Sequence, residues 1–345
     1  MKDHYEVTIG IPVYKSVDYV RNTIISALNQ TFLDIEFLIV DDCGGDGSID
    51  VIEHLQLNHS RGNDIRILRN DHNRGVSFSR NRIVDEAFGK YLFFMDSDDE
   101  IEPDTIEILY TAVVQHHAQA AYGSYEIIDT VSATQNQVYQ KDSIVFTSPD
   151  ELAMYSFCHN NIFHVSVCNS LFDLAFLRQT GIRFLEVSFW EDMAFTTEMV
   201  TKINRAVLLS DITYHYLLRE NSLSHYQMRK QIPQSDIMNV VCVLNYLKSK
   251  TIKLKGKPYL PYLCYNLEVN SFYVICYILR NSSRIVPKIK PKEIRQIMKH
   301  PLSIGDIWGL NDKRTANFVL GFLDYLPYPI FLIVVLLLGK IKRVI

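Results

Sequence analysis

The stretch Phe93-Phe-Met-Asp-Ser-Asp-Asp-Glu100 joins an apolar strand pattern to a group of carboxylates at its end. Residues two apart on a strand point to the same side, so the side chains of Asp96 and Asp98 are expected to lie together. Neighbouring carboxylates repel unless a proton or a cation lies between them, and one or two carboxylates plus phosphate oxygens are a usual arrangement around Mg²⁺. A solvated acidic turn or a helix N-cap is the alternative interpretation of an isolated Asp-x-Asp.

Strand and helix patterns alternate in the sequence before this group. We expect strands at residues 7–13, 34–42, 65–68 and 91–95, and helices at residues 18–30, 48–57 and 76–88. This alternation predicts an α/β fold with a doubly wound, mostly parallel sheet flanked by helices. Ligands of such sheets bind beyond the carboxyl ends of the strands, where the polar groups Pro12-Val-Tyr14, Asp41-Asp42 and Asp96-Ser-Asp-Asp99 all fall.

The rest of the chain divides into two further regions. Residues 116–225 show a mixed pattern, with a strand expected at 120–128 and a helix at 149–157, and residues 226–345 are mainly helical with several prolines. From Arg229 onward the chain has 19 Lys and Arg against 6 Asp and Glu, whereas the preceding residues have 16 against 33. This asymmetry indicates an acidic catalytic body and a basic C-terminal region suited to an anionic surface, although Lys-rich helix surfaces are also common.

The C-terminal region ends in an apolar run. Ile330 to Leu338 are nine consecutive apolar residues, followed by Lys340, Lys342 and Arg343. A membrane-spanning helix needs about 20 apolar residues, so the run predicts an interfacial or re-entrant membrane anchor rather than a crossing. A buried helix of the protein core is the alternative interpretation.

Cysteine usage and the N-terminus both predict a cytoplasmic protein. The six cysteines show no metal-binding spacing and lie mostly in apolar runs, which indicates buried, reduced thiols. The sequence begins Met-Lys-Asp-His-Tyr-Glu and passes directly into a strand pattern, which indicates no signal peptide.

Four blocks, in order, resemble the family 2 glycosyltransferases, whose catalytic domain has the GT-A fold. They are Ile9-Gly-Ile-Pro-Val-Tyr14, Glu36-Phe-Leu-Ile-Val-Asp-Asp42, Asn73-Arg-Gly-Val-Ser-Phe-Ser-Arg-Asn81 and Asp96-Ser-Asp-Asp99. The resemblance implies that residues 1–115 bind a nucleotide sugar and that residues 116–225 bind the acceptor. Residues 226–345 would then form a helical C-terminal region with a membrane-associating end.

The resemblance also implies roles for individual residues. Asp41 would contact the base and Asp42 would support its loop, while Arg80 would approach the nucleotide. Asp96 would contact the ribose, and Asp98, together with Asp96, would hold a divalent cation, Mn²⁺ or Mg²⁺. The full set of implied nucleotide-sugar-binding residues is Pro12, Val13, Tyr14, Asp41, Asp42, Asn73, Arg80, Asp96, Arg219, Ser222 and Ser224.

Two further segments resemble the family less closely. Phe189-Trp-Glu-Asp-Met-Ala-Phe195 resembles the block that supplies the general base, which implies that Asp192 takes the acceptor proton, with Glu191 as its neighbour or substitute. A helix N-terminal acidic pair is the alternative interpretation. Tyr214-His-Tyr-Leu-Leu-Arg-Glu-Asn-Ser-Leu-Ser224 resembles the segment that closes over the diphosphate, where Arg219 and Ser222 or Ser224 would contact phosphate oxygens. His215 is a candidate metal ligand there, or else a packed strand histidine.

The sequence departs from the family pattern at two places. Cys43-Gly-Gly-Asp46 replaces the usual Gly-Ser/Thr-Asp turn, and its glycines predict a looser loop. Ser170 stands where many relatives have a Lys near the acceptor, which leaves the acceptor or phosphate contacts open.

The resemblance implies an inverting glycosyltransferase of cell-surface polysaccharide synthesis. It would move a hexosyl or N-acetylhexosaminyl group from a nucleoside-diphosphate sugar, UDP-linked in most of the family, to a hydroxyl of a glycan or a polyprenyl-diphosphate-linked glycan. The predicted location is cytoplasmic, peripheral at the inner face of the cell membrane. No nucleic-acid partner is expected, and the sequence gives no indication of the oligomeric state.

Three other functions would require different sequence features. A nucleotidyltransferase would need a Gly-rich basic loop after the first strand, and a dinucleotide-binding dehydrogenase would need GxGxxG there; neither is present. A sugar-nucleotide-binding protein that has kept the fold without catalysis is the alternative that stays open.

Overall fold

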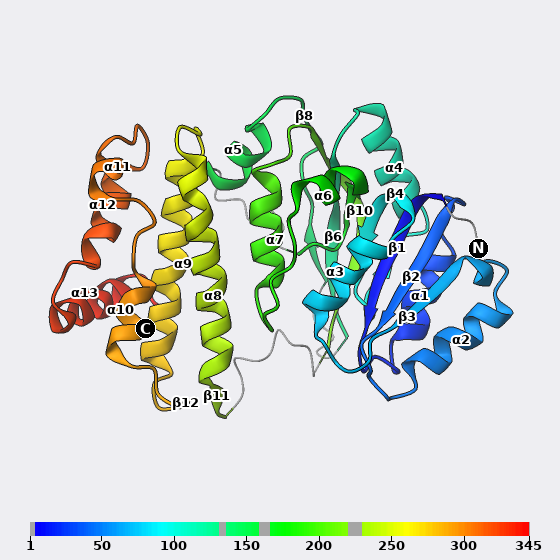
Figure 1. The fold of residues 1–345 in the computed structure, drawn as a ribbon, viewed down its shortest axis with the longest axis horizontal. Helices are drawn as coiled ribbons and strands as arrows, with labels where there is room; N and C mark the ends of the chain where they lie inside the picture. The colour runs from blue at the N-terminus through cyan, green and yellow to red at the C-terminus, as the bar shows by residue number, and fades with distance from the viewer. Residues whose placement is uncertain (1–3, 131–135, 159–165, 220–229, 345) are drawn as a thin grey trace. The chain divides into compact units, whose positions relative to one another are not determined.

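The computed structural model describes residues 4–130, 136–158, 166–219 and 230–344. The chain forms two compact units, whose elements are labelled in Figure 1. The first unit takes the described residues of 1–152, 164–186 and 199–222, and the second takes those of 153–163, 187–198 and 223–345. Two short segments of the 116–225 region therefore group with the C-terminal helices.

The first unit is built around one large sheet. Its strands lie in the order β3-β2-β1-β4-β9-β6-β10-β5, with β7 beside β6 and β8 beside β10. In chain order its elements are β1 (Tyr5–Val13), α1 (Val20–Leu28), β2 (Ile35–Asp41), α2 (Ser48–Asn58), a 3-10 turn (Gly62–Asp64), β3 (Ile65–Arg69), α3 (Val76–Glu86), β4 (Gly89–Phe94), β5 (Glu100–Ile101), α4 (Thr105–Gln115), β6 (Ala120–Asp129), β7 (Gln137–Tyr139), β8 (Ile144–Phe146), β9 (Ser170–Asp173), α6 (Leu174–Thr180) and β10 (Ala206–Leu218).

The long strands of this sheet all point the same way. β1 is parallel to β2 and β4, β2 to β3, and β6 to β10, while the short strand β9 is antiparallel to both β4 and β6. Their carboxyl ends therefore meet at one edge of the sheet. The predicted α/β fold with a mostly parallel sheet is confirmed, and the predicted strands and helices up to Met95 match β1 to β4 and α1 to α3 within a few residues.

The apolar runs of the sequence form the centre of the sheet. Strand β1 is almost entirely buried, as are the apolar residues of β2 and β4. Helix α3 packs on β1 and β2, α6 on β4 and β9, and α4 on β6 and β10. A strand buried by helices needs apolar residues at consecutive positions, which is why β1, β2 and β4 read as continuous apolar runs.

The second unit is helical. Helix α9 is its central element, because α8, α10, α12 and α13 each pack on it. Its elements are α8 (Gln234–Lys250), a 3-10 turn (Thr251–Leu254), α9 (Leu260–Arg280), α10 (Pro291–Ile297), α11 (Ile304–Trp308), α12 (Arg314–Leu323), α13 (Tyr328–Ile341) and the short pair β11 (Ile232–Pro233) and β12 (Ile285–Val286), joined by most of α5 (Glu151–Cys158) and α7 (Glu191–Val200).

A buried ion pair links the helices of this unit. Lys248 Nζ of α8 lies 2.7 Å from Glu268 Oε1 of α9, and both side chains are almost fully buried. The same ammonium donates to the carbonyls of Ile297 and Lys299. Because isolated charges are costly to bury, this pairing favours one alignment of α8, α9 and the end of α10.

Two further predictions can be compared with the structure here. Along the described residues, no helix combines the length and apolar character needed to cross a bilayer. The cysteines are free thiols, and Cys168, Cys264 and Cys276 are buried as predicted, but Cys43 and Cys242 are exposed. Cys43 is exposed because it lies in the turn that follows β2 rather than in the strand.

Candidate active site

The predicted acidic motif lies at the carboxyl end of β4 and meets an arginine from α3. Arg80 Nη2 donates to Asp96 Oδ1 at 2.8 Å, and the Arg80 side chain is almost fully buried while that of Asp96 stays partly open. The Arg80 guanidinium also lies 5.5 Å from the ring centroid of Phe184. Two residues that the sequence assigned to the nucleotide site are thus in direct contact.

A second arginine approaches the other carboxylate of the motif. Arg219 Nη1, at the end of β10, lies 3.7 Å from Asp98 Oδ2, and the guanidinium stacks on Tyr19 at 3.5 Å from the ring centroid. Burial and the neighbouring Asp96 raise the pKa of Asp98 to about 6, while Arg219 opposes that shift. Asp98 therefore lies where additional positive charge is favourable.

Asp99 was not among the predicted site residues, yet it holds the motif in place. It is buried, and its carboxylate accepts from the Tyr214 hydroxyl at 2.8 Å and from the Leu217 backbone N–H at 3.0 Å. The Tyr214 hydroxyl in turn accepts from the Asp96 N–H at 3.2 Å. Burial, then Asp96 and Asp98, raise the pKa of Asp99 well above its usual range. Asp99 thus ties β10 to the acidic loop, a role that no local sequence pattern signals.

His215 does not join the two aspartates as a third ligand. Its Nε2 lies 2.9 Å from Glu102 Oε1 and its Nδ1 lies 2.8 Å from Glu126 Oε1. Successive strand residues point to opposite faces, so His215 faces away from the side on which Tyr214 meets the acidic loop. In the part of the chain that the structure describes, no cluster of three or more His, Cys, Asp and Glu side chains has the arrangement of a metal site.

Asp42 organises the loop that leads into α3. It is buried, and it accepts from Asn70 Nδ2 at 2.7 Å, from the Arg74 N–H at 2.8 Å and from the Gly75 N–H at 2.8 Å. Gly75 is the N-cap of α3 with φ of 86°, a backbone conformation that favours glycine. Asp42 therefore sets the position of the helix that carries Arg80.

The other residues of this loop have different surroundings. Asn73 Oδ1 accepts from the Gly75 N–H at 3.1 Å, so its side chain shapes the turn. Asn70 was missed by the sequence analysis, although it bridges Asp42 and the hydroxyl of Ser79. Asp41 is half-buried and accepts from the Cys43 N–H at 3.0 Å. Part of the Asp41 side chain consequently remains open to a ligand.

A pocket of ≈ 230 Å³ lies beside the carboxyl ends of β1 and β2, and Val13 and Asp41 line it together with residues 44–50. Pro12 and Val13 end β1, paired with Val40 and Asp41 of β2. The next residue, Tyr14, is exposed. Of the predicted residues, Val13 and Asp41 thus line one cavity, and Pro12 and Tyr14 are the chain neighbours of Val13.

The turn after β2 is more strongly held than its glycines predict. Asp46 accepts from the Val17 N–H at 2.9 Å and from the Ser48 hydroxyl at 2.7 Å, and the Ser16 N–H donates to that hydroxyl at 3.0 Å. Burial opposes ionisation of Asp46, but the hydrogen bonds from Ser48 and Val17 outweigh it and lower its pKa. The expectation of a looser loop was wrong, because Asp46 and Ser48 supply contacts that the glycines do not.

The predicted base belongs to the second unit. Glu191 and Asp192 form the first turn of α7, and the Asp192 carbonyl accepts from the Thr196 hydroxyl at 2.8 Å. Ser222 and Ser224 lie outside the described residues.

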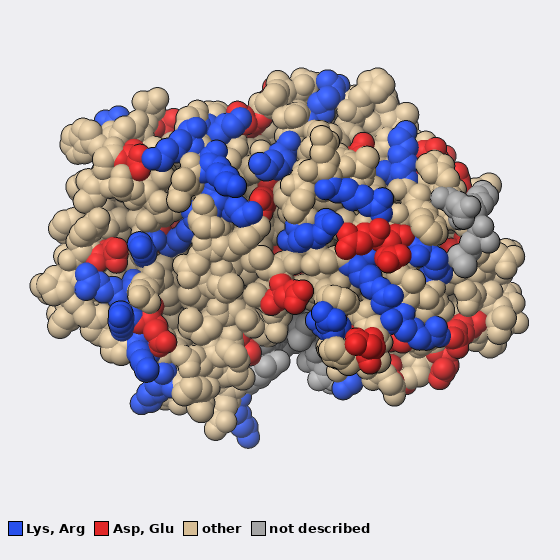
Figure 2. Space-filling view, in the orientation of Figure 1, with Lys and Arg blue, Asp and Glu red and all other residues tan. Residues whose placement is uncertain are grey.

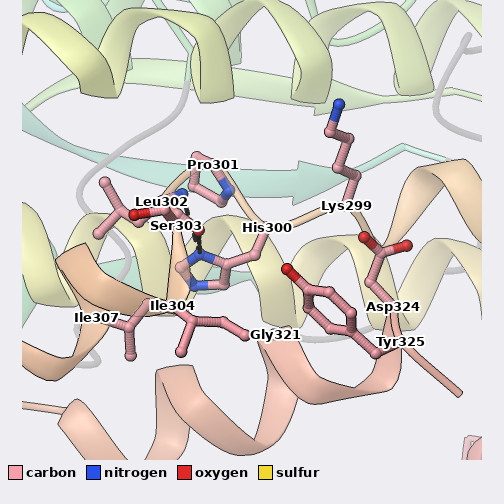
Figure 3. Close-up of a pocket in the computed structure, with 10 residues that line it drawn as sticks. All are labelled: Lys299, His300, Pro301, Leu302, Ser303, Ile304, Ile307, Gly321, Asp324 and Tyr325. Carbon is pink, nitrogen blue, oxygen red and sulfur yellow. Dashed lines mark hydrogen bonds between the residues drawn. The ribbon is translucent and has the colours of Figure 1, made fainter.

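The second unit has a pocket of its own, which no sequence motif indicated. It measures ≈ 270 Å³ and lies between α11 and the end of α12, as Figure 3 shows. His300 lines it, but His300 Nδ1 accepts from the Leu302 N–H at 3.1 Å and Nε2 lies 3.1 Å from Asn317 Oδ1. Burial lowers the pKa of His300. Both ring nitrogens of His300 thus serve contacts within the unit.

Comparisons with known proteins agree with this geometry. Residues 8–181 match the family model described as Glycosyl transferase family 2. The uncharacterized glycosyltransferase YibD of Escherichia coli (strain K12) is 27% identical over 238 residues, which cover 67% of this chain and 67% of YibD.

Two solved structures share the fold. S. aureus TarS 1-349 in complex with UDP has a TM-score of 0.67 at 17% identity, covering 93% of this chain and 89% of that one. The mannosyltransferase PcManGT from Pyrobaculum calidifontis, in complex with GDP-Man and Mn2+, has a TM-score of 0.54 at 13% identity, covering 93% and 87%. With a family match across residues 8–181 and the acidic motif at the end of β4, this chain belongs to glycosyl transferase family 2 and is a glycosyltransferase of the GT-A fold.

Proposed function

We propose that the chain transfers a hexosyl or N-acetylhexosaminyl group from a UDP-linked sugar to a hydroxyl of a glycan acceptor in polysaccharide synthesis, with inversion at the anomeric carbon. The observation that carries this proposal is the Asp96–Asp98 pair at the end of β4, flanked by the guanidinium groups of Arg80 and Arg219. Carboxylates and guanidinium groups at one edge of a sheet suit a diphosphate with its cation. The UDP and UDP-GlcNAc complexes of TarS support UDP as the nucleotide.

The acidic pair fits Mn²⁺ or Mg²⁺. Burial and Asp96 raise the pKa of Asp98 to about 6, so a cation beside it would relieve unfavourable charge. Asp98 with Asp96 would hold the ion, and oxygens of the donor phosphates would complete its coordination. When bound, the cation supplies positive charge to the departing nucleoside diphosphate. Arg219, adjacent to Asp98, adds a second charge for the same diphosphate.

Asp192 is the proposed general base. The acceptor hydroxyl must lose its proton as its oxygen attacks the anomeric carbon, and a carboxylate within hydrogen-bond reach can take that proton. Attack from the side opposite the diphosphate inverts the configuration in a single displacement. Glu191, the neighbouring residue at the start of α7, is the alternative acceptor of the proton.

The direct test is metal-dependent release of nucleoside diphosphate from UDP-, GDP- and dTDP-sugars, with and without Mn²⁺. We expect release from one UDP-sugar, lost in Asp98→Asn and kept in Asp104→Asn, which changes an exposed aspartate whose side chain makes no cap hydrogen bond. Asp192→Asn should abolish transfer while donor binding by calorimetry persists. Donor binding without release or transfer by the wild type would favour the non-catalytic alternative, and normal turnover of Asp192→Asn would disprove the assignment of the base.

We also propose that the end of the second unit contacts a membrane, where a polyprenyl-diphosphate-linked acceptor would be held. Helix α13 has two different sides. Phe331, Val335 and Gly339, spaced four residues apart, are buried in a helix that packs on α9. Ile333 and Ile341 remain 57% and 74% exposed. One side of α13 therefore belongs to the core, and the other is an apolar surface.

Helices α11 and α12 carry a second exposed apolar row. Trp308 is exposed, its ring lies 6.4 Å from that of Phe318, and Phe318 lies 6.5 Å from Phe322. Arg314 precedes Phe318 by one helical repeat, and Lys340 lies within the exposed side of α13. Figure 2 shows basic side chains beside broad uncharged surface over the C-terminal helices, at the left of the view. Apolar rows bordered by Lys and Arg are typical of helices that lie in the interface of an anionic membrane.

Vesicle binding tests this second proposal. Ile333→Asp and Leu337→Asp should reduce co-sedimentation with vesicles containing phosphatidylglycerol, because each places a charge on the exposed side of α13. Leu57→Asp, at an exposed leucine of α2, is the matched control and should not change it. Equal binding of all variants would contradict a membrane contact here. If the wild type does not bind vesicles, and Ile333→Asp and Leu337→Asp instead abolish its self-association, a second copy of this chain covers the surface.

A further inference from the structure

Tyr125, Tyr139 and Lys141 lie together on the half of the sheet formed by β6 and β10. Tyr125 of β6 is paired with Tyr214 of β10 and, across the antiparallel β7, with Tyr139. Paired residues of neighbouring strands point to the same face of a sheet. The two tyrosines thus share the face on which the Tyr214 hydroxyl contacts Asp99, whereas the next pair, His215 and Glu126, lies on the opposite face.

The two tyrosines stack on each other. Their ring centroids are 4.9 Å apart and their planes differ by 6°. Tyr139 remains 44% exposed although it is stacked, so part of its ring faces solvent. One face of a pyranose ring presents mainly C–H groups, which pack favourably against an aromatic ring. An aromatic pair in this position suits a sugar.

Lys141 lies beside this pair with an incompletely satisfied charge. Its backbone N–H donates to the Ser124 hydroxyl at 2.8 Å, and its Nζ donates to the Gly123 carbonyl at 2.5 Å and lies 5.4 Å from the Tyr125 ring centroid. Among the residues that the structure describes, no carboxylate pairs with this ammonium. Burial lowers the pKa of Lys141 to about 8. A half-buried cation with one carbonyl acceptor is unfavourable unless an anion completes its surroundings.

The sheet separates Lys141 from Arg80 of the donor site, whose partner Asp96 follows β4. β6 and β4 are not neighbours, because β9 lies between them, and β1 and β2 are farther along the sheet. Gly123, whose carbonyl accepts from Lys141, has no room for a side chain, since an added Cβ would lie 1.9 Å from the Thr213 hydroxyl. The close packing at Gly123 fixes the carbonyl, and with it the lysine, in this part of the sheet.

We propose that Tyr125, Tyr139 and Lys141 form an acceptor subsite that binds a sugar ring with an adjacent anionic group, a phosphate or a carboxylate. This inference rests on the proposed glycosyl transfer and assigns the acceptor a negative charge. The exposed part of Tyr139, held in place by its stacking on Tyr125, would contact the apolar face of the ring, and the Lys141 ammonium would pair with the anion. Lys141 is in this view a specificity-determining residue rather than a catalytic one.

The test compares three sugars in the presence of saturating UDP and Mn²⁺, which occupy the donor site. Binding of glucose 1-phosphate, methyl glucuronide and methyl glucoside is followed by saturation-transfer NMR. The wild type should prefer a charged sugar to methyl glucoside, and the stronger of the two charged ligands shows whether the natural anion resembles a phosphate or a carboxylate. Binding of neither charged sugar, or equal binding of all three, would overturn the proposal.

Substitutions test whether Lys141 causes the preference for a charged sugar. Lys141→Met should weaken the charged ligand roughly tenfold, about 1.4 kcal/mol, while Lys141→Arg retains most of the binding. Lys90→Met is the matched control, because Lys90 is also a lysine beside a tyrosine ring, with its Nζ 5.3 Å from the Tyr91 ring centroid. Lys90 stands at the N-terminal end of β4, whereas the acidic motif follows the C-terminal end of that strand. Tyr139→Ala should weaken all three sugars together.

Two measurements separate the possible failures. An equal loss in Lys90→Met, or loss of UDP binding in Lys141→Met, would mean that the lysine only supports the sheet, and either result would refute the subsite. The proposed function is judged separately by UDP release from the wild type. If UDP is released but Lys141→Met binds charged sugars normally, the subsite alone is wrong.

Discussion

Replacing Asp42 by Asn should destabilise the first unit strongly, although the two side chains have nearly the same shape. The Asp42 side chain is buried, and its carboxylate accepts from Asn70 Nδ2 at 2.7 Å, from the Arg74 N–H at 2.8 Å and from the Gly75 N–H at 2.8 Å. These bonds hold the loop that precedes α3. The substitution changes the charge and one acceptor atom without creating a cavity.

The expected loss follows from those three bonds. Asn keeps one carbonyl oxygen that can accept from Asn70 and Arg74, but without the negative charge each bond weakens by roughly 0.5–1 kcal/mol. Its NH₂ group cannot accept from the Gly75 N–H, so a bond to a charged group worth roughly 1.5–3 kcal/mol is lost. The total is roughly 2.5–5 kcal/mol of unfolding free energy, which corresponds to a fall of about 10 °C in melting temperature for a domain of this size.

Calorimetric melting of the full chain measures this effect, and Asp41→Asn is the matched control. Among the described residues, the Asp41 side chain accepts one hydrogen bond, from the Cys43 N–H at 3.0 Å, and Asn can keep this bond. The melting temperature of Asp41→Asn should therefore change by no more than about 2 °C. If Asp41 contacts the base as the resemblance implies, UDP affinity should fall in both variants. In Asp41→Asn the base contact would be weakened, and in Asp42→Asn helix α3 would be displaced. If Asp42→Asn melts within about 2 °C of the wild type, or Asp41→Asn falls as far, the loop does not depend on the Asp42 carboxylate.

Three further predictions concern buried or partly buried charges. Lys248→Met should lower the free energy of unfolding by about 3–5 kcal/mol, because it leaves the Glu268 carboxylate unpaired in the core. In urea unfolding, the double variant Lys248→Met/Glu268→Gln should recover at least half of that loss. Burial raises the pKa of Glu268 from 4.5 to about 7, so the folded state binds the Glu268 proton more tightly than the unfolded state does. The free energy of unfolding should therefore fall by up to about 3 kcal/mol as the pH rises from 4.5 through 7. This pH dependence should be absent in Glu268→Gln. The pKa of Asp98 is raised to about 6 by burial and by Asp96. If Asp98 holds the proposed Mn²⁺, it must lose its proton first, and the Mn²⁺ affinity measured by electron paramagnetic resonance should fall about tenfold from pH 7 to pH 5. Arg219→Gln should move that transition to higher pH, and an unchanged midpoint would show that Arg219 does not act on Asp98.

Much of the first unit could be predicted from the sequence because its signals are local. The apolar runs that became β1, β2 and β4 and the helical periodicity of α1 to α3 arise from repeats of two and about 3.6 residues, which are visible without any tertiary contact. The polar groups after these runs had to meet at one edge, since parallel strands end together. Asp41, Asp96 and Asp98 were predicted as site residues from their place at the ends of these strands and from the family resemblance.

Other features of the site have no local signal. Asn70 was not predicted, and Asp99 had no predicted role although it stands in the acidic motif, because their partners Asp42 and Tyr214 are 28 and 115 residues away. The antiparallel strand β9 was not predicted either, because a four-residue strand between β4 and β6 has too few residues to show a period.

The fold class, the family and the acidic motif can all be read from the sequence, since each depends on short patterns or on ordered blocks of residues. The pairing of charges, in contrast, depends on contacts between distant parts of the chain. Tyr214 reaches Asp99 while its neighbour His215 lies between Glu102 and Glu126, and a shift of one residue in the register of β10 would exchange their faces. Register is set by packing over the whole sheet, so the assignment of His215 to the two glutamates, and of Arg219 to Asp98, required the folded chain.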